Sequence, residues 1–307
     1  MFPEKIKEAK KHVPQIHIQF PSQKSWSSHG QFKRYALWPK AGRLETFQIP
    51  HWTAYYRFLN GSRFEQEPSE QKACCQIFVC QGAIEVSRAN GFIQKVSAGD
   101  FICGMYSEKD LANMECFGPT FLIVKYQADN LETIDNKLRP QTDLTYIPYF
   151  YGHGKVNDFE SALLHGSPFK NPTNLAAIVR FPKGTIVSSH YHDRPVFHEF
   201  IYLQGGHLTP DGFYGPGDHV TSIPQCKEGP WLATYEPSRE KLPLDWPQFT
   251  SEEKYVSDIL IPWERPFSKY KPDDIYGLLF VHGGPFVNLL AGINWHVIGA
   301  GELGPEG

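Results

Sequence analysis

The sequence predicts an all-β protein of two consecutive barrels with a short N-terminal helix. Short apolar runs are interrupted by glycine and proline, helix-period segments are scarce, and part of the pattern occurs twice. The runs expected to form strands are residues 47–52, 55–60, 75–82, 121–126, 175–181, 198–205, 276–284 and 286–292.

The repeat consists of three ordered matches between the two halves of the chain. An apolar strand ends in Gln-Gly at Gly82 and again at Gly205. An Asn-Gly or Asp-Gly dipeptide follows at residues 90 and 211, and both favour a hairpin because the two turn residues need positive φ. Each half then closes on a Gly-Asp pair, at Gly99 and at Gly217. The offsets between the copies drift by a few residues, as hairpins of different length would produce, so the halves are expected to share one fold.

These patterns divide the chain into four expected parts. The parts are an N-terminal helix or arm (1–30), a first barrel (31–127), a connecting segment (128–170) and a second barrel with C-terminal strands (171–307). The helix of the N-terminal part is expected in the first twelve residues. Within the connecting segment, residues 156–165 are compatible with a second short helix.

Composition excludes several classes of function. The 307-residue chain has a net charge of −3 and no basic stripe, so nucleic-acid partners are not expected. No run of 18 apolar residues is present, and the N-terminus lacks the apolar core of a signal peptide, so no membrane association is expected. The six cysteines have no CxxC spacing and two of them are adjacent, which favours reduced thiols in a cytoplasmic protein.

Three histidines crowd into residues 184–206. His190 and His192 are two residues apart, so on a strand they belong to one face. His198 or Glu199 returns on the next strand, after a connection that contains Pro195. Convergent imidazoles on neighbouring strands bind zinc, iron, nickel or copper, so the sequence predicts a metal site in the second barrel.

The segment resembles the first motif of the cupin family. Gly184 is followed by five residues, His190-x-His192, an acid or histidine, and a strand that ends in glycine, although the third ligand arrives later than usual. The motif places that ligand seven residues before a glycine. Gly205 selects His198 and Gly206 selects Glu199. The repeat favours Gly205, and both candidates stay open. The resemblance implies two jelly-roll (double-stranded β-helix) barrels, as in a bicupin.

The segment that follows is similar to the cupin domain of ChrR-type anti-sigma factors and related small metal enzymes. Gly205, Gly212, Gly217 and Pro224 occupy that family's positions, and its fourth ligand, a histidine, falls on Glu228. His219 is an alternative fourth ligand, and we expect His207 to point outward. In the first half the counted position holds Cys75, with no histidine upstream, so no metal is expected there.

The resemblance implies one divalent metal ion per chain, with iron(II) favoured and zinc, manganese, nickel or copper as alternatives. The expected activity is that of a dioxygenase on a small oxygenated molecule, diketone-like or phenolic. The alternatives are a non-redox lyase or isomerase that polarises a carbonyl, and a ligand sensor without catalysis. Many cupins dimerise, so the resemblance also suggests a homodimer.

Overall fold

The structure is a computed structural model of the chain. It describes residues 16–18, 27–29, 32–38, 51–58, 73–87, 93–106, 114–127, 137–140, 144–148, 150–151, 159–166, 173–187, 190–192, 196–209, 212–222, 231–235, 271–283, 287–290 and 295–297.

Every regular element among the described residues is a β-strand, which confirms the all-β prediction. The helix expected in the first twelve residues lies outside the described residues. No helix in the described part of the chain is long and apolar enough to cross a membrane.

The chain divides into two compact units. The N-terminal unit comprises residues 21–144 and 258–270, and the C-terminal unit comprises residues 1–20, 145–257 and 271–307. The domain boundaries given above remain predictions.

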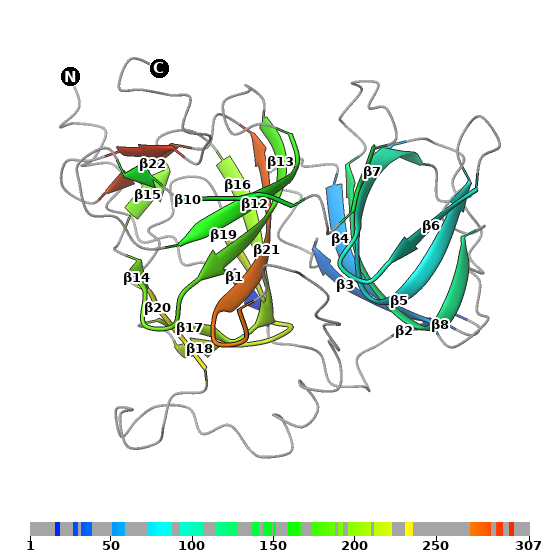
Figure 1. Cartoon of the computed structure of the whole chain (residues 1–307), viewed down its shortest axis with the longest axis horizontal. Helices are drawn as coiled ribbons and strands as arrows, with labels where there is room; N and C mark the ends of the chain where they lie inside the picture. The colour runs from blue at the N-terminus through cyan, green and yellow to red at the C-terminus, as the bar shows by residue number, and fades with distance from the viewer. Residues whose placement is uncertain are drawn as a thin grey trace. The chain divides into compact units, whose positions relative to one another are not determined.

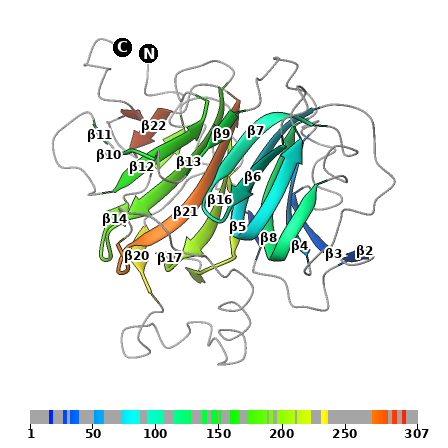
Figure 2. The ribbon, with the colours of Figure 1, turned by 45° about the vertical axis from the view of Figure 1, so that its right-hand side comes forward.

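The N-terminal unit is organised around two long strands that pair with each other over most of their length (Figure 2). Its sheet has the order β2-β3-β4-β8-β5-β7-β9, and β6 pairs with the second half of β5. The strands are β2 (Ser27–His29), β3 (Phe32–Trp38), β4 (His51–Phe58), β5 (Ala73–Ser87), β6 (Ile93–Ser97), β7 (Phe101–Tyr106), β8 (Glu115–Gln127) and β9 (Lys137–Arg139).

The C-terminal unit contains three sheets among its described strands (Figure 1). The strands are β1 (Ile16–Ile18), β10 (Tyr146–Pro148), β11 (Phe150–Tyr151), β12 (Glu160–His165), β13 (Thr173–Phe181), β14 (Ile186–Val187), β15 (His190–His192), β16 (Val196–Gln204), β17 (Gly206–Thr209), β18 (Gly212–Tyr214), β19 (His219–Ser222), β20 (Trp231–Thr234), β21 (Ile275–Gly283), β22 (Val287–Leu290) and β23 (Trp295–Val297).

Two of these sheets have the strand order of a jelly roll. One contains the run β19-β16-β21-β13, extended by β1 at one edge and by β12 and β10 at the other, and the second is β14-β20-β17-β18. With β13, β14 and β16–β21 numbered one to eight along the chain, the orders are 6-3-8-1 and 2-7-4-5. This is the double Greek key of jelly-roll domains. The third sheet, β11-β23-β22-β15, carries the His190–His192 segment.

The core of the C-terminal unit lies between the two jelly-roll sheets, because one apolar cluster takes side chains from both. Its members on β13, β16 and β21 come from the first sheet, and those on β14, β18 and β20 come from the second. The cluster consists of Phe159, Leu175, Ala177, Val179, Phe181, Val187, Phe200, Tyr202, Tyr214, Val220, Ala233, Ile275, Leu279 and Val281.

The internal repeat is visible in the backbone of each unit. In the N-terminal unit the N–H of Val79 donates to the carbonyl of Asp100 (3.1 Å), and the N–H of Gly99 donates to the carbonyl of Val79 (2.7 Å). The C-terminal unit forms the same two bonds at the same two distances, through Tyr202, Asp218 and Gly217. The strand order β4-β8-β5-β7 also matches β13-β21-β16-β19. The repeat predicted from the sequence therefore corresponds to matching hydrogen bonds at the glycine turns and to a matching order of four strands.

The second short helix, considered for residues 156–165, is wrong. Residues Glu160–His165 form β12, which pairs with β10 and β13. The buried positions of β12 do not alternate strictly, because Ser161 and Ala162 are buried in succession, and the register of its ladder shifts further along, between Leu163 and His165. The segment therefore lacks the regular period of two that would have predicted a strand.

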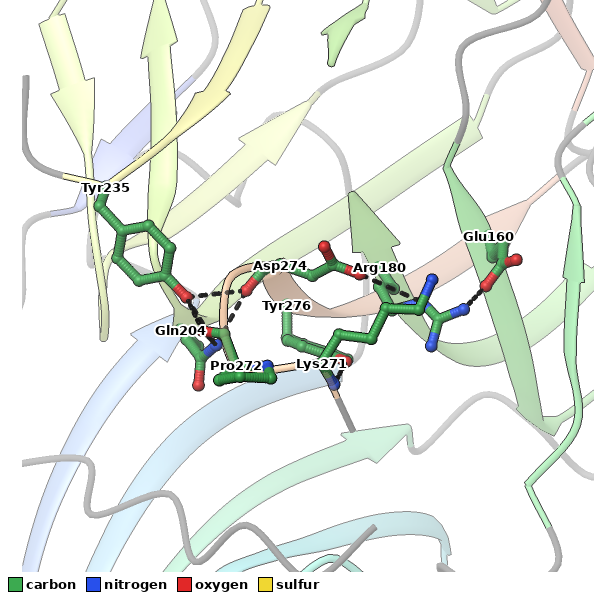
Figure 3. A network of polar contacts seen from close by, with 8 residues as sticks. All are labelled: Glu160, Arg180, Gln204, Tyr235, Lys271, Pro272, Asp274 and Tyr276. Carbon is green, nitrogen blue, oxygen red and sulfur yellow. Dashed lines mark hydrogen bonds and ion pairs between the residues drawn. The ribbon is translucent and has the colours of Figure 1, made fainter. Parts of the chain in front are cut away.

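A polar network fixes the start of β21 (Figure 3). The side-chain amide of Gln204 donates to the carbonyl of Asp274 (2.8 Å), to the carbonyl of Pro272 (3.1 Å) and to the Tyr235 hydroxyl (2.8 Å). Arg180, on the face of β13 opposite the core cluster, forms ion pairs with Glu160 and with Asp274. These contacts hold the strand that lies beside β16.

Candidate metal centre

His190 and His192 lie on β15, and His198 lies on β16, the next strand along the chain. β15 pairs with β22, with His190 opposite Leu290 and His192 opposite Asn288. Three residues separate the end of β15 from the start of β16, which pairs with β21, the strand that precedes β22. The two consecutive strands β15 and β16 therefore pair with the two consecutive strands β22 and β21. His190 and His192 occupy alternate positions of β15, as the sequence predicted for a strand.

His198 belongs to the inward face of β16. Its cross-strand partners are Ser222 on β19 and Val281 on β21. Successive residues of a strand point to opposite faces, so His198 shares its face with Phe200 and Tyr202, both members of the core cluster. The side chain is 5% exposed. His198 is thus a buried imidazole at the end of the jelly-roll interior where β16 begins.

Glu199 belongs to the opposite face of the same strand. Its carboxylate accepts a hydrogen bond from Nε2 of His219 (2.9 Å), and both side chains are almost completely buried. The Thr221 hydroxyl lies 3.4 Å from the same nitrogen. Glu199 and His219 therefore form a pair on the face of the sheet opposite the core cluster. His198 lies on the core face, so His219 and His198 are on opposite faces.

The remaining candidate, Glu228, lies outside the described residues, and the side chains of His190 and His192 are not described either. Among the side chains that are described, no group of three or more histidine, cysteine, aspartate or glutamate residues is arranged to hold a metal ion. The complete ligand set thus remains a prediction.

His207 was expected to be exterior, and this prediction is wrong. The side chain is 1% exposed and lies on the inward face of β17, opposite Ala233 and Tyr214, which belong to the core cluster. Its Nδ1 shares a hydrogen bond of 3.0 Å with the Tyr202 hydroxyl, and its ring stacks on Trp231 with the centroids 5.5 Å apart. Burial lowers the pKa of His207 to about 3, so the imidazole is neutral near pH 7.

The N-terminal unit has a cysteine at the position equivalent to His198. Cys75 is fully buried in the core cluster of that unit and lies opposite Tyr126 and Gly104. Its neighbour Gln76, the equivalent of Glu199, is buried on the other face. All five cysteines in the described part of the chain are free thiols, which agrees with the expectation of reduced cysteines; they are Cys74, Cys75, Cys80, Cys103 and Cys116.

Comparison with known proteins supports the fold and leaves the activity open. No protein-family model matches the chain, and no curated protein matches it. A Pseudomonas aeruginosa protein described as glyoxylate-induced shares 10% identity, with 87% of this chain and 88% of that one covered and a TM-score of 0.54. At that identity the likeness supports a shared fold alone.

Two further solved structures have TM-scores just under 0.5. A quercetin 2,3-dioxygenase from Acinetobacter baumannii shares 12% identity, with 88% of this chain and 86% of that chain covered and a TM-score of 0.48. A mutant of an oxalate decarboxylase from Bacillus subtilis shares 10% identity, with 91% and 80% covered and a TM-score of 0.49. At these scores neither structure decides between activities.

Proposed function

We propose that the C-terminal unit binds one divalent metal ion and that the chain is a metal-dependent enzyme of the cupin type. The observation that supports this most directly is the placement of His198. It is a buried imidazole on the inward face of β16, and the strand before it carries His190 and His192 at alternate positions. Three imidazoles suit iron, zinc, nickel or copper.

His198, rather than Glu199, is the third ligand in this proposal. Glu199 is already engaged by His219 on the opposite face, and two successive residues of a regular strand cannot both point at one ion. Glu228 completes the set from the segment that follows β19. Three histidines and one glutamate leave coordination positions open on an octahedral ion, which a substrate with two neighbouring oxygens can occupy.

The activity proposed for this site is an iron(II)-dependent dioxygenation of a small diketone-like or phenolic molecule. A bound iron(II) ion supplies the Lewis acid and redox chemistry. The chain itself supplies the surroundings: Phe181, Phe200, Tyr202 and Trp231 fill the interior beyond His198 and limit the entry of water. The N-terminal unit, with Cys75 at the equivalent position, binds no metal in this proposal.

Metal analysis of the purified full-length protein tests the proposal. We expect about one metal ion per chain, lost in His198→Ala and retained in Glu199→Gln, with the far-ultraviolet circular dichroism of both variants unchanged. Retention of metal in His198→Ala together with its loss in Glu199→Gln would assign the third ligand to Glu199. A wild-type protein that binds no iron, zinc, nickel or copper would refute the metal site.

With iron loaded anaerobically, oxygen consumption on addition of diketones or catechols tests the activity. Uptake matched to loss of substrate supports the dioxygenase. Turnover of substrate without oxygen uptake would instead indicate a lyase or isomerase and would overturn the proposed reaction while leaving the metal site intact.

A further inference from the structure

The ring of Phe200 lies over Gly277, one inward pair along the sheet from the pair to which Phe200 itself belongs. Phe200 is opposite Leu279, and the next inward pair along the ladder is Tyr202 opposite Gly277. A Cβ atom placed on Gly277 would collide with the Phe200 ring, and even its more distant contact, with Cε2, would be 2.8 Å. The ring therefore occupies the space that a side chain at residue 277 would fill.

This displacement is directed away from His198. Along β16 the inward residues are His198, Phe200 and Tyr202, and along β21 their partners are Val281, Leu279 and Gly277. The space over Gly277 is thus one inward pair beyond Phe200, on the side farther from His198.

Other rings surround Phe200 on that same side. The Tyr202 ring lies 4.9 Å from it between centroids, in an edge-to-face arrangement. Phe181, which is opposite Ile275 and so one pair beyond Gly277, lies 6.1 Å away, and the His207 ring is stacked at 6.0 Å. These rings prevent Phe200 from moving farther from His198 if the space over Gly277 is filled.

We infer that Gly277 determines how much space is open beside His198. Because residue 277 has no side chain, the Phe200 ring can lie over it, away from the metal position. This inference rests on the proposed metal site. A methyl group at residue 277 displaces the Phe200 ring. Because Tyr202, Phe181 and His207 block movement away from His198, the ring moves toward His198. The ring then covers the imidazole and the space that a metal ion and its substrate require. Gly277 is in this sense a positioning residue that touches neither.

Titration of metal-free, full-length protein with cobalt(II) tests the inference, because cobalt(II) reports its ligands through visible absorption. We expect Gly277→Ala to weaken cobalt binding at least tenfold relative to wild type. The double variant Gly277→Ala/Phe200→Leu should recover binding to within about threefold, because the smaller side chain no longer reaches His198. Binding as in wild type by Gly277→Ala, or absence of recovery in the double variant, overturns the inference.

Leu278→Ala is the matched control for lost packing. Leu278 is fully buried on the same strand but points to the opposite face from Gly277, so cobalt binding should stay as in wild type while the melting temperature falls. Equal weakening in Leu278→Ala and Gly277→Ala would mean that general destabilisation is responsible, and would refute the inference.

Phe200→Trp keeps the test decisive where Gly277→Ala does not fold. The indole is too large for the space over Gly277, so we expect cobalt binding to weaken at least tenfold with Gly277 intact. Binding as in wild type by Phe200→Trp refutes the inference. Failure of the wild-type protein to bind cobalt, by contrast, refutes the proposed metal site itself.

Discussion

His207 should make the C-terminal unit sensitive to acid. In the folded protein burial holds its pKa at about 3, whereas in the unfolded chain the pKa is near 6.5. The unfolded state therefore takes up a proton below pH 6.5 that the folded state excludes. The stability contributed by the neutral imidazole is complete above pH 6.5 and is lost progressively as the pH falls toward 3.

The size of the effect follows from the difference in pKa. Each pH unit between the two pKa values changes the free energy of unfolding by about 1.4 kcal/mol, so lowering the pH from 7 to 4.5 should cost about 2.7 kcal/mol as an upper bound. In His207→Phe this contribution is absent. The variant is less stable at pH 7, because the Tyr202 hydroxyl loses its 3.0 Å partner, but it loses less stability on acidification.

Urea unfolding followed by tryptophan fluorescence at pH 7 and pH 4.5 measures both quantities. The decisive quantity is a difference: the change in the free energy of unfolding between the two pH values in wild type, minus the same change in His207→Phe. The contributions of other titrating groups cancel in this difference. Tyr202→Phe is the control, since it removes the hydrogen bond but keeps the buried imidazole, and its acid sensitivity should persist. Equal acid sensitivity in wild type and His207→Phe would refute the reasoning.

Two further predictions concern the backbone that positions the site. Gly205→Ala should destabilise the protein by about 2 kcal/mol or more in urea unfolding, because residue 205 has φ of 62° and a Cβ atom there lies 2.7 Å from Cγ1 of Ile275; an unchanged midpoint would contradict this. Gln204→Ala should cost about 1–3 kcal/mol, because the amide serves the carbonyls of Pro272 and Asp274 as well as the Tyr235 hydroxyl, and a melting temperature equal to that of wild type would show that the network does not stabilise β21.

The sequence predicted the fold well at the turns, where glycine is required by the backbone conformation. Gly82, Gly99, Gly205 and Gly217 have positive φ in the structure, so the repeated glycines mark backbone positions that other residues adopt with strain. Matching these glycines was therefore equivalent to matching the turns of two similar folds. The alignment of Gly205 with Gly82 also pairs His198 with Cys75, and both residues lie on inward faces in the structure.

The face of His207 could not be predicted, because alternation fails between β16 and β17. The register of β16 shifts between Tyr202 and Gln204, and Gly205, with positive φ, interrupts the chain between β16 and β17. A shift of one residue exchanges the two faces of a strand, so inward and outward positions on β17 do not continue those of β16. The cross-strand partners of His207, which are distant in sequence, decide its face.

A comparison of the two units shows which features of the backbone are independent of the residue at the inward position, Cys75 in one unit and His198 in the other. Both share the order of four strands (β4-β8-β5-β7 and β13-β21-β16-β19) and the same hydrogen bonds at the glycine turns, so these features do not depend on a histidine at the inward position. Cys75 packs there as a small apolar side chain among core residues, whereas His198 places an ionisable ring in a comparable interior. The N-terminal unit therefore shows that an apolar residue can occupy this inward position, so packing alone does not require a histidine there.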